Sequence, residues 1–135
     1  MPLGLQIGSH DTHVLLWWAL DPDKLSESAF TLVAEMEHRG GFASAISIWE
    51  LGVKVQRGKL DLGISIEEFA RRIDKSAIVQ LLPVTTAIWL RSLELGWDHR
   101  DPADRVIVAT ALLLELPLAT ADDEIRRFGG VNCVW

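Results

Sequence analysis

Short apolar runs alternate with segments of helical periodicity along the whole chain. The apolar runs predict five strands, over residues 3–7, 41–45, 78–84, 118–120 and 131–134. Strands that alternate with helices are typical of an α/β domain whose sheet is mostly parallel. We therefore predict a three-layer α/β/α fold with a mostly parallel sheet of about five strands.

Helix-start signals lie between these runs. Ser26, Ser65 and Thr85 each stand directly before a helical segment, and Ser65 with Glu68 three residues later forms a capping-box pattern. The other predicted helices cover residues 13–20, 46–57 and 103–115, with a short one after Asp122. The segments that follow Ser26 and Thr85 are predicted to end at His38 and Leu93.

The segment 103–115 has apolar residues all round when it is drawn as a helix. It is therefore predicted to be buried on every side. The helix begins with the sequence Asp101-Pro102-Ala103-Asp104. Asp101 suits the N-cap, Pro102 the first helical position, and Asp104 is an acid at the third position. We interpret Asp101 as a cap, whereas Asp104 lies on an otherwise apolar face and needs a partner.

The helix 46–57 carries two apolar stripes. Ile46, Trp49 and Val53 form one stripe, and the other consists of Ile48, Leu51 and Val55. One stripe is expected to face the sheet. The second is either covered by a neighbouring helix or offered to a partner.

Composition excludes several classes of protein. The 135 residues suit one domain, and 49% apolar residues exclude intrinsic disorder. With 19 acidic and 13 basic side chains the net charge is -6, which argues against a protein that binds nucleic acid by bulk positive charge. The single cysteine and the lack of a signal-like start indicate a cytoplasmic protein. The apolar segments 13–20 and 106–120 are shorter than the roughly 20 residues that span a bilayer, so no membrane association is expected.

Four acids follow predicted strands or open the helices next to them. Asp11 comes after the first strand, Glu50 lies one turn into the helix 46–57, and Asp104 and Asp122 open later helices. Open parallel sheets bind ligands at the carboxyl ends of their strands, so these four side chains are expected to converge there.

Clustered carboxylates repel one another unless a cation holds them. Oxygen ligands without paired histidines or cysteines favour Mg²⁺ or Mn²⁺, and such a site favours metal-assisted hydrolysis of phosphodiesters. Each acid also has a plainer interpretation. Asp11 and Asp122 would serve as helix caps, and Glu50 would pair with Lys54 on the helix surface.

Four sequence blocks carry a resemblance to a known family. The blocks are Asp11-Thr12-His13-Val14-Leu15-Leu16-Trp17, Ser44 to Leu51 with Lys54, His99-Arg100-Asp101-Pro102-Ala103-Asp104-Arg105, and Thr120-Ala121-Asp122. Together they resemble PIN-domain ribonucleases, and more narrowly the VapC-type toxins of type II toxin–antitoxin pairs. The similarity runs from Asp11 to Trp135, so residues 1–135 are interpreted as a single PIN domain. The block from His99 to Arg105 is the most specific signal.

The resemblance implies a site and a reaction. Asp11, Glu50, Asp104 and Asp122 would form the Mg²⁺ cluster, and Ser44 and Thr120 would orient carboxylates or form strand-end hydrogen bonds. Arg105 would contact the scissile phosphate or, the interpretation we favour, pair with a neighbouring acid. The implied activity is endonucleolytic cleavage of RNA that leaves a 5′ phosphate. The implied partners are a cognate antitoxin and a second copy of the chain in a homodimer.

One departure and two alternatives accompany this interpretation. Ile7 is followed by Gly8, Ser9 and His10, where the family has apolar residues, so the first strand is expected to be short or shifted. The basic side chains available for RNA are sparse. An alternative is therefore a catalytically inactive PIN-fold module that binds a protein. A phosphoacceptor receiver domain fits poorly, because no lysine after the last strands lies beside the acids.

Overall fold

The computed structural model describes residues 4–8 and 11–135. Its five strands form one sheet in the order β3-β2-β1-β4-β5, and every neighbouring pair is parallel. The strands are β1 (Leu5–Ile7), β2 (Gly41–Ser44), β3 (Val79–Leu82), β4 (Leu118–Ala119) and β5 (Cys133–Val134). The predicted five-stranded parallel sheet is confirmed.

The strands are shorter than the apolar runs that predicted them. Residue 45 was assigned to a strand, but Ala45 is the first residue of a helix that starts where β2 ends. Apolar residues next to a strand stay buried in the first turn of a following helix, so hydrophobicity alone does not mark the boundary. Residue 3 of the predicted first strand lies outside the described residues.

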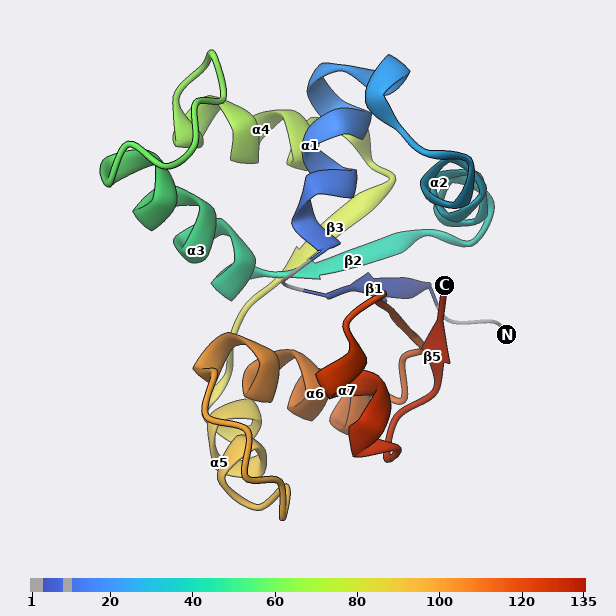
Figure 1. The fold of residues 1–135 in the computed structure, drawn as a ribbon, viewed down its shortest axis with the longest axis vertical. Helices are drawn as coiled ribbons and strands as arrows, with labels where there is room; N and C mark the ends of the chain where they lie inside the picture. The colour runs from blue at the N-terminus through green and yellow to red at the C-terminus, as the bar shows by residue number, and fades with distance from the viewer. Residues whose placement is uncertain (1–3, 9–10) are drawn as a thin grey trace.

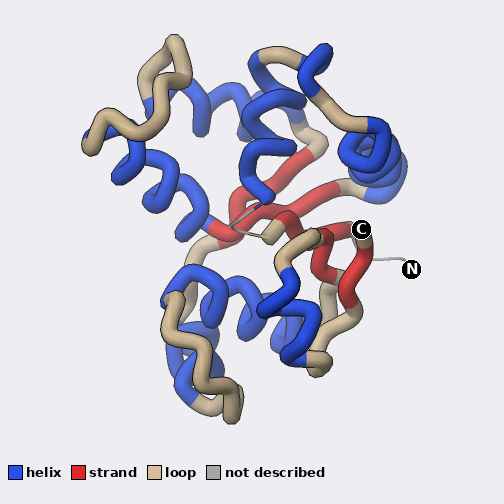
Figure 2. The backbone as a smooth tube through the Cα atoms, viewed as in Figure 1, coloured by secondary structure: helices blue, strands red, loops and turns tan. Residues whose placement is uncertain are grey.

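Helices cover both faces of the sheet. They are α1 (Thr12–Leu20), α2 (Glu27–Arg39), α3 (Ala45–Gln56), α4 (Ile66–Ser76), α5 (Thr86–Leu93), α6 (Pro102–Leu114) and α7 (Asp123–Phe128), with a short 3₁₀ helix η2 (Pro22–Lys24). Figure 1 shows α1 to α4 on one side of the strands and α5 to α7 on the other. The strands form the middle layer of three, as Figure 2 shows and as the pattern of runs predicted.

The predicted caps begin three of these helices. The hydroxyl oxygens of Ser26, Ser65 and Thr85 accept hydrogen bonds from the main-chain N–H of Ala29, Glu68 and Ile88, respectively. Each bond satisfies an amide that the first turn of a helix leaves without a carbonyl partner.

Helix α6 is the most buried helix and is fastened to the central strand. The carboxamide Nε2 of Gln6, a fully buried residue of β1, donates to the main-chain oxygen of Ile107 at 3.1 Å. The prediction that 103–115 is buried on every side is correct as far as Ala111. It is wrong for the last turn, where Leu113 and Leu114 are exposed by 42% and 45%. There the helix ends and Glu115 adopts a left-handed conformation as the chain turns towards β4.

One apolar stripe of α3 faces the core and the other reaches the surface. Leu51 is buried and Ile48 packs beside it, with side chains of α1, α2 and α4. Trp49 of the second stripe is 66% exposed. Together with Trp89 and Pro102 it lines an apolar surface hollow of about 540 Å³.

Within the described part of the chain, none of the helices combines the length and the hydropathy needed to cross a membrane.

Candidate metal centre

The register of the sheet places three residues side by side at its carboxyl edge. Ile7 of β1 pairs with Ala43 of β2 and with Ala119 of β4, so Gly8, Ser44 and Thr120 follow at the same level. The amide of Gly8 continues the ladder by donating to the Ala119 oxygen at 3.0 Å. The side chains that follow β1, β2 and β4 therefore start from one edge, as expected for a parallel sheet.

Asp11 is turned towards β4 rather than towards its own helix. It occupies the N-cap position of α1 without making a side-chain cap hydrogen bond. Its Oδ1 accepts instead from the main-chain N–H of Ala121 at 3.2 Å, across 110 residues of sequence. The cap interpretation of Asp11 is therefore wrong, and a carboxylate that is only 8% exposed joins the ends of β1 and β4.

Thr120 and Asp122 form a turn at the end of β4. The fully buried Thr120 hydroxyl accepts from the Asp122 amide at 3.0 Å. Oδ1 of Asp122 accepts from the amides of Glu124 at 2.8 Å and Ile125 at 3.4 Å, which caps α7. The plainer interpretation of Asp122 as a cap is confirmed, and the cap orients its carboxylate at the carboxyl edge of the sheet.

Ser44 and Glu50 come from the neighbouring strand and helix. Ser44 is buried, and its hydroxyl accepts from the Ile46 amide at 3.3 Å, so it caps α3. Both Ser44 and Thr120 thus form the strand-end hydrogen bonds that were one of their two interpretations. Glu50 is half-buried on α3, while Lys54, one turn later, is exposed.

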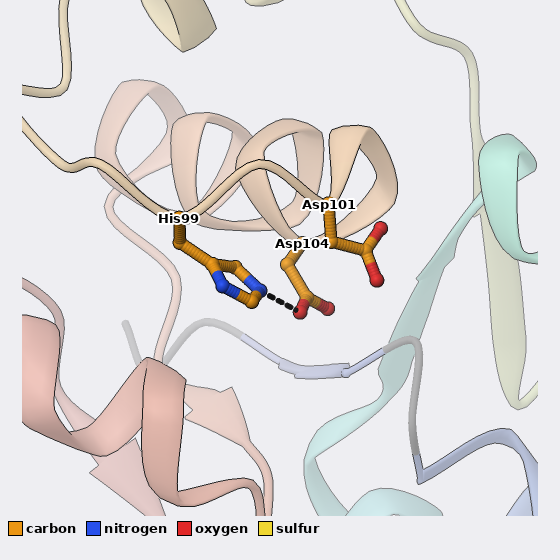
Figure 3. Close-up of side chains that lie close together, drawn as sticks. All are labelled: His99, Asp101 and Asp104. Atoms are coloured by element: carbon orange, nitrogen blue, oxygen red, sulfur yellow. Dashed lines mark hydrogen bonds and ion pairs between the residues drawn. The ribbon is translucent and has the colours of Figure 1, made fainter.

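Asp104 is the most deeply buried acid of the predicted set. It lies in the first turn of α6, its residue is 0% exposed, and its Oδ2 is 2.8 Å from Nε2 of His99. Asp101 caps the same helix, as predicted, by accepting from the Ala103 amide at 3.0 Å. One ligand atom from each of His99, Asp101 and Asp104 lies within 4.8 Å of the others. Figure 3 shows the three side chains on the same side of the start of α6.

His99 is a residue of this site to which the sequence analysis assigned no role. Its imidazole stacks on the indole of Trp97 at 4.7 Å between ring centroids, and Trp97 in turn contacts the ring of Phe128 at 5.1 Å. The available signal was its place in the block that ends with Asp104 and Arg105. The contact itself depends on how the loop before α6 folds back, which periodicity does not predict.

Arg105 contacts main-chain oxygens rather than the neighbouring acid that we favoured as its partner. Its guanidinium donates to the carbonyl of Ser92 at 2.6 Å, to that of His99 at 3.0 Å and to that of Trp97. Arginine presents several donors in a fixed plane, which suits three carbonyls that a loop brings together. Arg105 therefore fastens the segment between α5 and α6.

The donor chemistry of this edge fits a hard divalent cation. Burial of carboxylates such as Asp11 and Asp104 is costly unless positive charge or hydrogen-bond donors compensate. The positive end of the α6 helix dipole, close to Asp104, supplies part of that compensation. Asp104 is the one predicted acid in the group of possible ligand atoms that it forms with His99 and Asp101; Asp11, Glu50 and Asp122 are not in that group.

The sequence of this chain is similar to those of known proteins. The pattern of the PIN domain matches residues 10–131. Ribonuclease VapC22 of Mycobacterium tuberculosis is 32% identical over 118 residues, which cover 86% of this chain and 87% of that protein.

Solved structures share the fold at lower sequence identity. DNA-bound VapBC from Salmonella typhimurium aligns with a TM-score of 0.69 at 14% identity, covering 98% of this chain and 97% of that one. A toxin–antitoxin complex from Klebsiella pneumoniae aligns with a TM-score of 0.63 at 19% identity, covering 98% and 97%.

Proposed function

The chain belongs to the PIN-domain family, and from that premise we propose that it is a Mg²⁺-dependent endoribonuclease acting as the toxin of a toxin–antitoxin pair. The observation that carries the proposal is the pair of buried carboxylates on the side chains of Asp11 and Asp104. They are far apart in the sequence, and each is held by a hydrogen bond: Asp11 accepts from the distant Ala121 amide, and Asp104 from the nearby His99. The 32% identity to a ribonuclease supports RNA as the substrate.

We assign the ion to the four predicted acids, Asp11, Glu50, Asp104 and Asp122. Mg²⁺, or Mn²⁺ in its place, would polarise a phosphoryl oxygen and lower the pKa of an attacking water. The chain's own part is to hold the carboxylates in place before the ion and the RNA arrive. The Ala121 amide holds Asp11, the Thr120 hydroxyl fixes the backbone of Asp122, and His99 contacts Asp104.

The partners in this proposal are an antitoxin and a second copy of the chain. The toxin–antitoxin complex with the same fold supports a cognate antitoxin as the partner. In our proposal this antitoxin covers the acidic edge. The homodimer predicted from the family resemblance is part of the same proposal.

The test is cleavage of RNA by the purified chain. We expect activity with Mg²⁺ or Mn²⁺, its loss with EDTA, and a fall of at least about 100-fold in Asp11→Asn and Asp104→Asn, because each removes a charged ligand. Asp123→Asn is the matched control, since Asp123 is exposed and adjacent to Asp122. Far-UV circular dichroism and urea unfolding would check that each variant folds.

Two results would contradict the proposal. Activity that survives EDTA and both substitutions would exclude metal-dependent cleavage by these acids. A folded chain that binds no divalent ion and cuts no RNA, yet binds the protein encoded next to it tightly, would be the inactive interaction module.

A further inference from the structure

The contact between His99 and Asp104 was not anticipated from the sequence. We propose that His99 is a positioning residue: its imidazole holds the Asp104 carboxylate in the orientation that binds the divalent ion. The inference rests on the proposed function, because it concerns how this chain prepares one of the proposed ligands.

The hydrogen bond between His99 and Asp104 has a defined direction. Nε2 of His99 lies 2.8 Å from Oδ2 of Asp104. A carboxylate oxygen accepts and has no hydrogen to give, so the imidazole N–H is the donor. Because Asp104 is fully buried, this bond restricts the rotation of its carboxylate without competition from bulk water.

His99 is itself held at its ring and at its main chain. Its ring stacks on Trp97 with an interplanar angle of 30°, and Trp97 is supported by Phe128 of α7. Its main chain is fixed by Arg105, which donates to the carbonyls of both Trp97 and His99. A donor whose ring and backbone are both held can fix the orientation of the group that accepts from it.

His99 positions Asp104 and does not itself ligate the ion through Nε2. A histidine ligates a metal through the lone pair of an unprotonated ring nitrogen. Nε2 carries its hydrogen towards Asp104, so that nitrogen offers no lone pair to an ion beside the carboxylate. In other metal sites, groups that orient a ligand in this way change metal affinity by about 10- to 100-fold when they are removed.

The experiment separates the N–H donor from the ring. His99→Phe keeps an aromatic ring for Trp97 but has no donor, whereas the amide of His99→Gln places an N–H group near the Nε2 position. We expect His99→Phe to weaken Mg²⁺ and Mn²⁺ binding equally, by about 10- to 100-fold in calorimetry. His99→Gln should recover most of that loss. His38→Phe, on the exposed surface of α2, is the matched control and should bind as the unsubstituted chain does.

Each outcome decides the question. Unchanged or tighter binding in His99→Phe would overturn the proposal, as would a His99→Gln variant as weak as His99→Phe. Loss of Mn²⁺ affinity with Mg²⁺ affinity intact would also overturn it, because it would identify His99 as a direct nitrogen ligand. If His99→Phe fails to fold, His99→Asn replaces it; its shorter amide reaches the Nδ1 position, so it should bind more weakly than His99→Gln.

Failure of the proposed function gives a different result. If the unsubstituted chain binds neither ion, the metal centre itself is absent and the inference falls with it. If it binds the ions and cleaves RNA while His99→Phe binds them equally well, only the role of His99 is wrong.

Discussion

Gly8 has no room for a side chain beside the Asp11 carboxylate and the Thr120 hydroxyl. A Cβ atom at this position would be 2.8 Å from Oδ2 of Asp11 and 3.1 Å from Oγ1 of Thr120. The first of these atoms is the end of a side chain and can move, so the fold should survive a methyl group there. The Asp11 carboxylate would be displaced from its position at the carboxyl edge.

We therefore predict that Gly8→Ala lowers divalent-ion affinity and RNA cleavage by at least about tenfold while costing no more than about 2 kcal/mol of stability. Calorimetry and urea unfolding would measure the two effects. Gly52→Ala is the control: a Cβ there meets only Ile66 at an ordinary 3.7 Å, and alanine favours the helix by about 0.5–1 kcal/mol. A Gly8→Ala variant with unchanged ion affinity would contradict the prediction.

The contacts of some residues could be predicted from the sequence, and those of others could not. The cap roles of Ser65 and Asp101 were predictable because a cap involves only the next two or three residues. The contacts of His99 and Arg105 were not, because they depend on the path of the segment between α5 and α6. That segment has no apolar periodicity, and only the folded chain brings two of its carbonyls, with that of Ser92 in α5, to one guanidinium.

The end of β4 and the start of α7 form an element in which one residue, Asp122, has two separable roles. As a cap, its Oδ1 satisfies the amides of Glu124 and Ile125. As a proposed ligand, it contributes negative charge to the metal centre. Asparagine keeps the carbonyl oxygen that caps but loses the charge, whereas alanine loses both.

We predict that Asp122→Asn retains stability to within about 0.5 kcal/mol, and that Asp122→Ala loses about 1 kcal/mol, the usual contribution of a cap. Both variants should bind Mg²⁺ more weakly to a similar degree. Urea unfolding without metal and calorimetry with Mg²⁺ would separate the two roles. Full ion affinity in Asp122→Asn would restrict Asp122 to capping and leave three acids for the ion.

The sequence predicted which segments form helices or strands better than it predicted where each one begins and ends. Helix α5 has the predicted bounds, Thr86 to Leu93, and the Thr85 hydroxyl caps its start. The strands are shorter than predicted, since the runs 78–84 and 131–134 contain the apolar residues Ile78, Val84 and Val131, which pack against the core beyond the strand ends. Hydrophobicity reports burial, whereas a strand also requires main-chain pairing.

The whole molecule has a net charge of -6 and yet is proposed to act on a polyanion. Alternation of strands and helices predicted the fold, and parallel pairing explains why Asp11, which follows β1, reaches the amide of Ala121, which follows β4. The sequence did not show how many cations remain for RNA. The structure engages several of them: Arg71 and Arg72 pair with Glu68, Arg127 pairs with Glu124, and Arg105 binds carbonyls.

Because acidic side chains outnumber basic ones, RNA binding should depend on the metal more than on surface charge. One bound Mg²⁺ changes the formal charge from -6 to -4, and the ion itself meets the phosphate. Each phosphate neutralised by a side chain contributes about -0.7 to the slope of log K against log salt for a single strand. Three or four contacts therefore predict a slope of about -2 to -3 in KCl at constant Mg²⁺.

Stopped-flow anisotropy with a labelled RNA, read before cleavage, would measure this slope. Omission of Mg²⁺ should weaken binding at every salt concentration. A slope steeper than about -6, or binding indifferent to Mg²⁺, would show instead that a basic surface formed by a partner or a second copy attracts the RNA.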